Sequence, residues 1–96
     1  MAVIQVTPEV LRAKANEIRS IKDEHDEAMA RMRTLILGLN DTFKGQAHDA
    51  LVAKYEGMQS TFTQFSQLIE SYAAILDNNA NVMENADQTL ASQNRG

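Results

Sequence analysis

A heptad repeat of mostly apolar residues runs without a slip through the second half of this 96-residue chain. Its members alternate spacings of four and three residues: Leu51, Tyr55, Met58, Phe62, Phe65, Ile69, Tyr72, Leu76, Asn79, Met83, Ala86 and Leu90. This spacing puts every member on one stripe of an α-helix that packs along another helix. Leu68, Ile75 and Val82 each precede a member by one position and widen the stripe, which favours a bundle with two contact faces.

The first half of the chain predicts a second long helix. Thr7, Pro8 and Glu9 form a helix start, because threonine caps free amides, proline suits the first helical position and glutamate favours the positive end of the helix dipole. A stripe with a seven-residue period follows: Leu11, Ile18, His25, Met32 and Leu39. We therefore expect this helix to span about 8–39.

A short turn separates the two predicted helices. Residues 40–45 combine asparagine, aspartate and threonine with Gly45, and a connection this short makes the following helix antiparallel. The expected fold is all-α, a single helical-hairpin domain over 1–96 with a second helix at about 46–91 and a frayed tail at 92–96. Gly57 lies off the stripe, and a glycine there costs about 1 kcal/mol of helix propensity relative to alanine.

Two paired helices cannot cover a stripe this wide, so the chain is expected to associate with another chain. The predicted core of the hairpin and the dimer comprises Leu11, Ile18, Met32, Leu51, Tyr55, Met58, Phe62, Phe65, Ile69, Tyr72 and Leu76. The second helix, with about 48 residues against about 32, should outrun the first by roughly 24 Å. We expect this overhang to begin near Asn79 and to leave Met83, Ala86 and Leu90 without a partner in the hairpin.

Composition excludes several classes of function. A net charge of −4 argues against nucleic-acid binding, and the absence of cysteine rules out disulfides and thiolate sites. No stretch reaches the roughly 18 apolar residues of a membrane span, and residues 1–6 lack the features of a signal peptide. We find no catalytic constellation, and we expect no enzyme activity and no cofactor.

The histidines and nearby polar residues have structural interpretations. Residues 23–27, which include His25, form a charge run that fans around a helix and favours solvation over metal binding. His25 itself is interpreted as a polar layer that fixes helix register, with pH sensing as the alternative. Asn79 also specifies register, and no nucleophile accompanies His48.

The turn contains an aromatic residue with a physical role. Phe43 precedes Gly45 by two positions, so its ring can plug the open end of the bundle while glycine allows a tight turn beneath it. We therefore predict that Phe43 packs at the turn end of the bundle.

Together these features resemble the WXG family, the early-secreted-antigen-like proteins of about one hundred residues from type VII (ESX) secretion systems. The resemblance covers nearly the whole chain, including residues 4–12, and the opening is similar to that of homodimeric members from Firmicutes. In the central motif Phe43 stands in place of the family's tryptophan, while Gly45 and Ala47 fit. In the tail export signal Met83 replaces a tyrosine, whereas Asp87, Leu90 and Asn94 match.

The resemblance implies a homodimeric four-helix bundle exported without a cleaved signal peptide. It further implies that a membrane-bound FtsK/SpoIIIE-like ATPase recognises the C-terminal tail. The chain would then serve as a secreted effector or an export co-factor. Two alternatives stay open: a heterodimer with a related family member, acting as chaperone for a larger type VII toxin, and a cytosolic coiled-coil adaptor unrelated to export.

Overall fold

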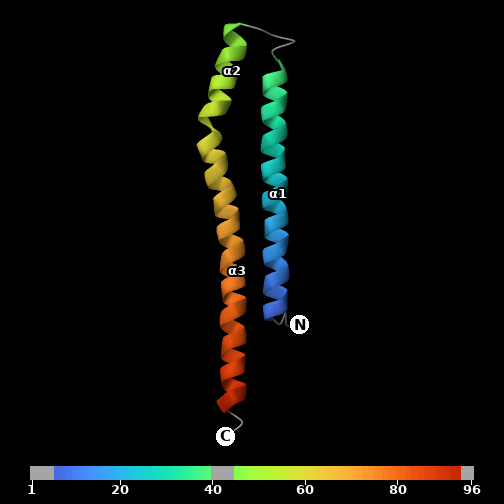
Figure 1. The fold of residues 1–96 in the computed structure, drawn as a ribbon, viewed down its shortest axis with the longest axis vertical. Helices are drawn as coiled ribbons and strands as arrows, with labels where there is room; N and C mark the ends of the chain where they lie inside the picture. Colours follow the sequence, from blue (N-terminus) through green and yellow to red (C-terminus); the bar gives the residue numbers. More distant parts are fainter. Residues whose placement is uncertain (1–5, 40–44, 94–96) are drawn as a thin grey trace, which may run out of the picture.

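The chain forms a rod of antiparallel helices (Figure 1). The computed structural model describes residues 6–39 and 45–93, with side chains up to residue 90. Helix α1 (Pro8–Gly38) lies beside α2 (Gln46–Gly57) and α3 (Gln59–Gln93), which follow one another along the rod. The radius of gyration is 22.0 Å, against about 12.5 Å for a compact domain of this length. The expected all-α hairpin is therefore confirmed.

The start of α1 follows from its first three residues. The Oγ1 atom of Thr7 accepts a hydrogen bond of 3.2 Å from the main-chain N–H of Val10, and Thr7 has the extended backbone of an N-cap. Pro8 occupies the first turn, where its missing N–H has no partner to lose. The helix therefore begins where the sequence predicts.

The second half of the hairpin departs from the prediction of one continuous helix over 46–91. The helix stops at Gly57 and restarts at Gln59, with Met58 between at φ −91° and ψ −4°. The N–H of Met58 donates to the carbonyl oxygen of Tyr55, three residues back, at 3.0 Å. Gly57 explains the break, because glycine lowers helix propensity by about 1 kcal/mol at that point.

The helix ends differ from the predicted ones by one or two residues. Helix α1 ends at Gly38, and Leu39 follows in a 3₁₀ turn instead of closing the helix. Helix α3 continues to Gln93, so the tail expected to fray from 92 is helical for two residues more. Shifts of this size are usual where the last turn tightens.

The core of the hairpin is a narrow line of small and half-buried side chains. Ala15 on α1 and Ala73 and Ala80 on α3 are fully buried, and their small side chains let the two backbones approach closely. The larger side chains of Ile69 and Tyr55 are also buried. Among the described residues no large side chain is fully buried, so the hairpin has little interior of its own.

The predicted heptad stripe divides into two halves in the structure. Alternate members lie in or beside the hairpin seam: Tyr55, Phe62, Ile69, Leu76 and Met83. Ser66, Ala73 and Ala80 complete this seam in the positions between. Met58, Phe65, Tyr72, Asn79 and Ala86, in the other series, are exposed. At the two ends of the stripe, Leu51 is half-buried and Leu90 is exposed. The stripe therefore has two contact faces, one towards α1 and one left open for another chain.

Helix α3 passes the start of α1, but by less than expected (Figure 1). The guanidinium of Arg12 donates to the carboxylate of Glu84, which places Glu84 beside the first turns of α1. Met83 is likewise half-buried, so the overhang does not begin near Asn79. The nine residues of 85–93 follow this last ion pair and correspond to roughly 14 Å of helix.

Candidate interaction surfaces

One face of the hairpin is apolar along most of its length, and we call it the apolar face. It carries Met58 at the break between α2 and α3, then Phe65, Leu68, Tyr72, Ile75, Val82 and Leu90 on α3, and Ile21, Met32 and Leu35 on α1; all are exposed. His25 joins the two helices on this side, since its ring centroid lies 5.2 Å from that of Phe65. Because Tyr72 and Ile75 are 55% and 54% exposed, this face has no partner within the described residues of the hairpin.

The opposite flank carries a ladder of ion pairs between the helices. Arg12 pairs with Glu84 at 2.6 Å, Arg19 pairs with both Glu70 and Asp77, and Arg33 pairs with Glu56 at 3.6 Å. The hydrogen bonds that Arg12 and Arg19 donate to these carboxylates raise the pKa of both arginines, and the bond from Arg12 lowers the pKa of Glu84. The ladder fixes which flank of α3 lies beside which flank of α1.

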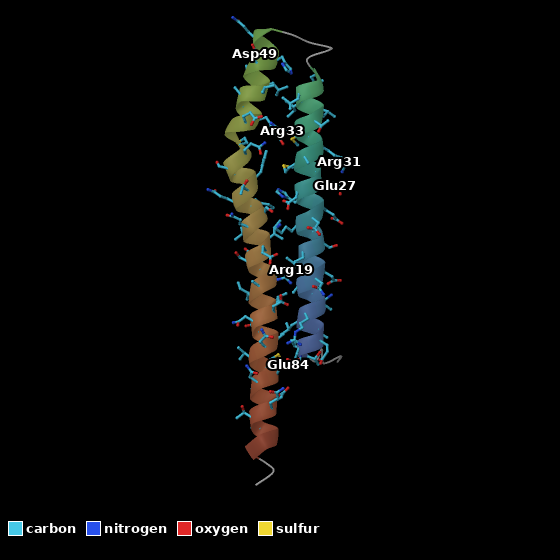
Figure 2. All side chains as sticks on the ribbon, viewed as in Figure 1. Arg19, Glu27, Arg31, Arg33, Asp49 and Glu84 are labelled. Atoms are coloured by element: carbon cyan, nitrogen blue, oxygen red, sulfur yellow. The ribbon has the colours of Figure 1, made fainter. Side chains whose placement is uncertain are left out.

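Sequence reasoning missed this ladder, although its signal is in the sequence. Arg12 and Arg19 are seven residues apart and Arg33 follows at twice that interval, while Glu70, Asp77 and Glu84 also follow a seven-residue spacing. Such charges occupy the edge of a helical seam. Glu27 and Arg31, by contrast, lie on the side of α1 turned away from α3 (Figure 2).

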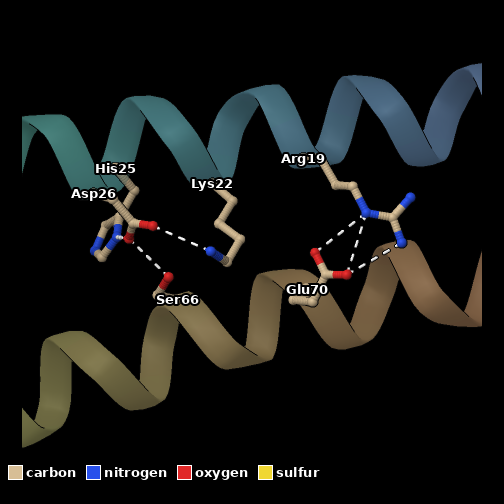
Figure 3. A network of polar contacts seen from close by, with 6 residues as sticks. All are labelled: Arg19, Lys22, His25, Asp26, Ser66 and Glu70. Atoms are coloured by element: carbon tan, nitrogen blue, oxygen red, sulfur yellow. Dashed lines mark hydrogen bonds and ion pairs between the residues drawn. The ribbon is translucent and has the colours of Figure 1, made fainter.

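Asp26 interrupts the ladder with a different kind of contact (Figure 3). Its carboxylate accepts hydrogen bonds from Ser66 Oγ at 2.7 Å, His25 Nδ1 at 3.2 Å and Lys22 Nζ at 3.2 Å. The bond from Ser66, followed by that from His25, lowers the pKa of Asp26 to about 2. Asp26 thus bridges the two helices from a position seven residues from both Arg19 and Arg33, where these neighbours on the ladder are arginines.

Two side chains of α2 hold this short helix to α1. The phenol of Tyr55 donates to the carbonyl oxygen of Met29 at 2.6 Å, and Nε2 of His48 donates to that of Ile36 at 3.1 Å. Both side chains are buried. The two donors, His48 and Tyr55, are seven residues apart on α2, and the two acceptors are seven residues apart on α1. The same contact is therefore made twice, two helical turns apart, along the antiparallel pair.

The turn motif is described in part. Gly45 is the N-cap of α2 with φ 93°, a conformation that glycine adopts without strain. Ala47 is exposed in the first turn of α2. Phe43 lies outside the described residues, and its packing stays a prediction.

The residues of the predicted export signal share the last part of α3. Asp87 and Leu90 are exposed, Leu90 at 57%, whereas Met83 is half-buried in the hairpin seam. Asn94 lies outside the described residues. The structure thus separates Met83, which packs in the hairpin, from Asp87 and Leu90, which are open to a partner.

Over residues 6–39 and 45–93 we find no group of three histidine, cysteine or acidic side chains arranged to hold a metal ion. The acidic run at 23–27 is spread around α1, as its helical spacing predicts. No helix in these same ranges combines the length and apolar character needed to cross a membrane.

Known proteins share both the sequence pattern and the fold. The family model for proteins of 100 residues with WXG matches residues 3–88. Protein YukE of Bacillus subtilis is 33% identical over 94 residues, which cover 98% of this chain and 97% of YukE. An ESAT-6-like protein of Streptococcus agalactiae is 27% identical over the full length of both chains. The crystal structure of EsxA from Geobacillus thermodenitrificans superimposes with a TM-score of 0.79 at 26% identity, covering 95% of this chain and 98% of EsxA.

Proposed function

Because this chain belongs to the WXG100 family of type VII secretion systems, we propose that it is a small exported protein that works as a homodimer and catalyses no reaction. The observation that carries the proposal is the apolar face. A protein of this mass, 10.7 kDa, exposes about 5,500 Å² when it folds as a compact monomer. This chain exposes 7381 Å².

The excess surface, roughly 1,900 Å² per chain, is what a second copy would cover. Stable interfaces bury about 800 Å² on each partner, and obligate ones bury more and are more apolar. The apolar face supplies side chains of the required kind on both α1 and α3. Two hairpins that meet through this face form a four-helix bundle with the ion-pair ladders on the outside.

The end of α3 is the segment we propose to carry the export signal. It projects past α1, and Leu90 and Asp87 are exposed on it. An exposed apolar side chain on a projecting helix is suited to a groove on another protein, and the nearby carboxylate adds charge selectivity. The partner we propose is the membrane-bound FtsK/SpoIIIE-like ATPase of the secretion system, and export proceeds without cleavage of a signal peptide.

Deletion of residues 83–96 tests the export signal. A truncated protein that folds and dimerises but stays in the cell supports the proposal. The control is the double variant Asp87→Asn and Leu90→Gln in the full-length chain, which removes the two exposed groups without shortening α3. Normal secretion of both proteins through a type VII system would show that the tail is not the signal.

A heterodimer with a related family member is the second candidate, because the same apolar face suits any hairpin with a matching stripe. In that case the chain serves as the chaperone of a larger toxin. Mass and composition of the complex purified from the native cell decide between the candidates: two identical chains support the homodimer. A complex found only in the cytosol, in cells with an active type VII system, would favour the adaptor.

A further inference from the structure

A groove opens on the ladder flank of the hairpin, near the break between α2 and α3. It has a volume of about 470 Å³. Met29, Tyr55 and Phe62 are the apolar part of its lining, and short side chains such as Ala30 and Thr63 leave it open. None of the exposed residues of the apolar face lines the groove, although His25 of the lining also contacts Phe65 of that face.

The heptad pattern explains why the groove is where it is. Asp26 lies midway between Arg19 and Arg33, and Thr63 lies midway between Glu56 and Glu70. At the neighbouring positions a long arginine meets a glutamate and covers the seam. Here Asp26 instead bridges to Ser66 and also accepts from Lys22 (Figure 3). Asp26 and Thr63 are shorter than the arginine–glutamate pairs on either side, so the seam is less covered at this level.

The groove contains a buried donor that lacks an acceptor. The Nε2 atom of Gln59, in the first turn of α3, is buried and has no hydrogen-bond partner in the described part of the chain. A buried polar group left unpaired costs about 1–3 kcal/mol. Because the Gln59 side chain also lines the groove, a small rotation that turns its amide towards a bound oxygen acceptor would recover that free energy.

The charges at the groove favour an acidic occupant. Its lining includes two cations, Lys22 and Arg33, and one carboxylate, Asp26, which pairs with Lys22, on a chain whose net charge is −4. Glu56 lies outside the lining and pairs with Arg33 at 3.6 Å, a longer distance than in the ladder pairs of Arg12 and Arg19, and the Arg33 side chain is 55% exposed. Arg33 is therefore available to a second carboxylate.

We propose that this groove binds an acidic segment of another protein, which places an apolar side chain against Met29, Tyr55 and Phe62 and a carboxylate near Gln59 and Arg33. The apolar floor supplies most of the contact area, and the donors select the charge of the segment. The site goes beyond the proposed export function, since it lies neither on the dimer face nor on the tail.

The first experiment titrates the ¹⁵N-labelled full-length protein with the blocked hexapeptide acetyl-Glu-Leu-Glu-Glu-Leu-Glu-amide and follows its backbone amide signals. We expect saturable shifts at Ala30, Arg33, Gln59 and Thr63, with binding at least tenfold weaker for the peptides in which glutamine or lysine replaces every glutamate. Equal binding of the lysine peptide would overturn the proposal. So would shifts centred on Phe65 and Tyr72, or no saturable shift up to 10 mM peptide.

Matched variants then locate the site. Gln59→Met removes the orphaned donor at nearly constant volume, and Arg33→Gln removes the exposed cation; each should weaken binding at least fivefold. Gln64→Met and Arg12→Gln are the controls, because these residues lie outside the groove lining, and they should bind as the wild type does. Sedimentation of the same samples reports the dimer separately. Wild-type binding by both Gln59→Met and Arg33→Gln would contradict the proposal even if the protein is dimeric.

Discussion

The phenol of Tyr55 donates a 2.6 Å hydrogen bond to the carbonyl oxygen of Met29, and this contact ties the end of α2 to the middle of α1. It lies three residues before the helix break at Met58. Tyr55 also packs against Phe62 across the break, with ring centroids 5.6 Å apart. One side chain thus connects α2 both to the opposite helix and to α3.

Replacing Tyr55 with phenylalanine removes the hydrogen bond and keeps the ring. We expect Tyr55→Phe to lower the free energy of unfolding by about 0.5–1.5 kcal/mol, the net contribution of a typical intramolecular hydrogen bond. Urea unfolding followed by circular dichroism measures the change. Tyr72→Phe is the comparison variant: it removes a hydroxyl from the apolar face, where the side chain is 55% exposed in the single hairpin, and shows what a tyrosine-to-phenylalanine change costs elsewhere. A loss as large in that variant would show that the Tyr55–Met29 contact is not responsible.

Alanine at Gly57 should mend the break between α2 and α3. A Cβ at this position meets no atom within 4 Å, and alanine favours the helix by about 1 kcal/mol. We expect Gly57→Ala to raise stability by up to about 1 kcal/mol and to slow amide hydrogen exchange at residues 55–60. Unchanged exchange there would show that Gly57 does not cause the break.

The same substitution at Gly45 should have the opposite sign. A Cβ on Gly45 also meets no atom within 4 Å, but the residue has φ 93°. A side chain in this region is strained by about 1–2 kcal/mol, so Gly45→Ala should lower the melting temperature. A rise in the melting temperature would mean that α2 can begin with another backbone conformation.

A charge on the apolar face should separate the dimer. Ile75 is 54% exposed on this face, and burying a carboxylate there without a partner is strongly unfavourable. We expect Ile75→Asp to sediment as a single chain at micromolar concentrations at which the wild type has twice that mass. Ala74→Asp adds the same charge at an exposed neighbouring position off this face and should stay dimeric. Dimeric Ile75→Asp would place the interface elsewhere.

The contribution of Asp26 to stability should depend on pH. Its pKa in the fold, about 2, is below the usual value of 3.8. The ionised carboxylate therefore stabilises the fold fully above pH 4, and this contribution is lost as the pH falls towards 2. We expect Asp26→Asn to melt below the wild type at pH 7 and the gap to shrink by pH 2. For the exposed Asp23→Asn control the gap should stay small throughout; a constant gap for Asp26→Asn would contradict the assignment.

Local signals in the sequence predicted the helices well and their lateral packing less well. Thr7, Pro8 and Gly45 mark helix ends through their own backbone chemistry, which needs no partner to act. The seam was harder, because Phe62 and Phe65 both fit a four-three spacing and only the opposite helix decides which one faces it. Ala73 and Ala80, which lie in the hairpin seam, carry too little apolar area to stand out in a sequence pattern.

The groove at Gln59 could not be predicted for a related reason. It depends on short side chains from two helices, among them Asp26, Ala30 and Thr63, lying at one level, which only the paired structure brings together. The ion-pair ladder was not predicted either, although the seven-residue spacing of its charges is present in the sequence. Its meaning depended on knowing that α1 and α3 are antiparallel, which the short turn had already indicated.

The three lines along α3, which are the hairpin seam, the apolar face and the ladder, share one helical phase. One residue inserted into α3 turns everything after it by about 100°, which would move Tyr72 or Ile75 off the apolar face and Asp77 off the ladder together. Substitutions change one line at a time, whereas insertions and deletions disturb all of them. Met58 is a weaker point, since the regular helix already stops and restarts there. Length variation in such a chain should therefore concentrate at the turn, at the tail and at this break.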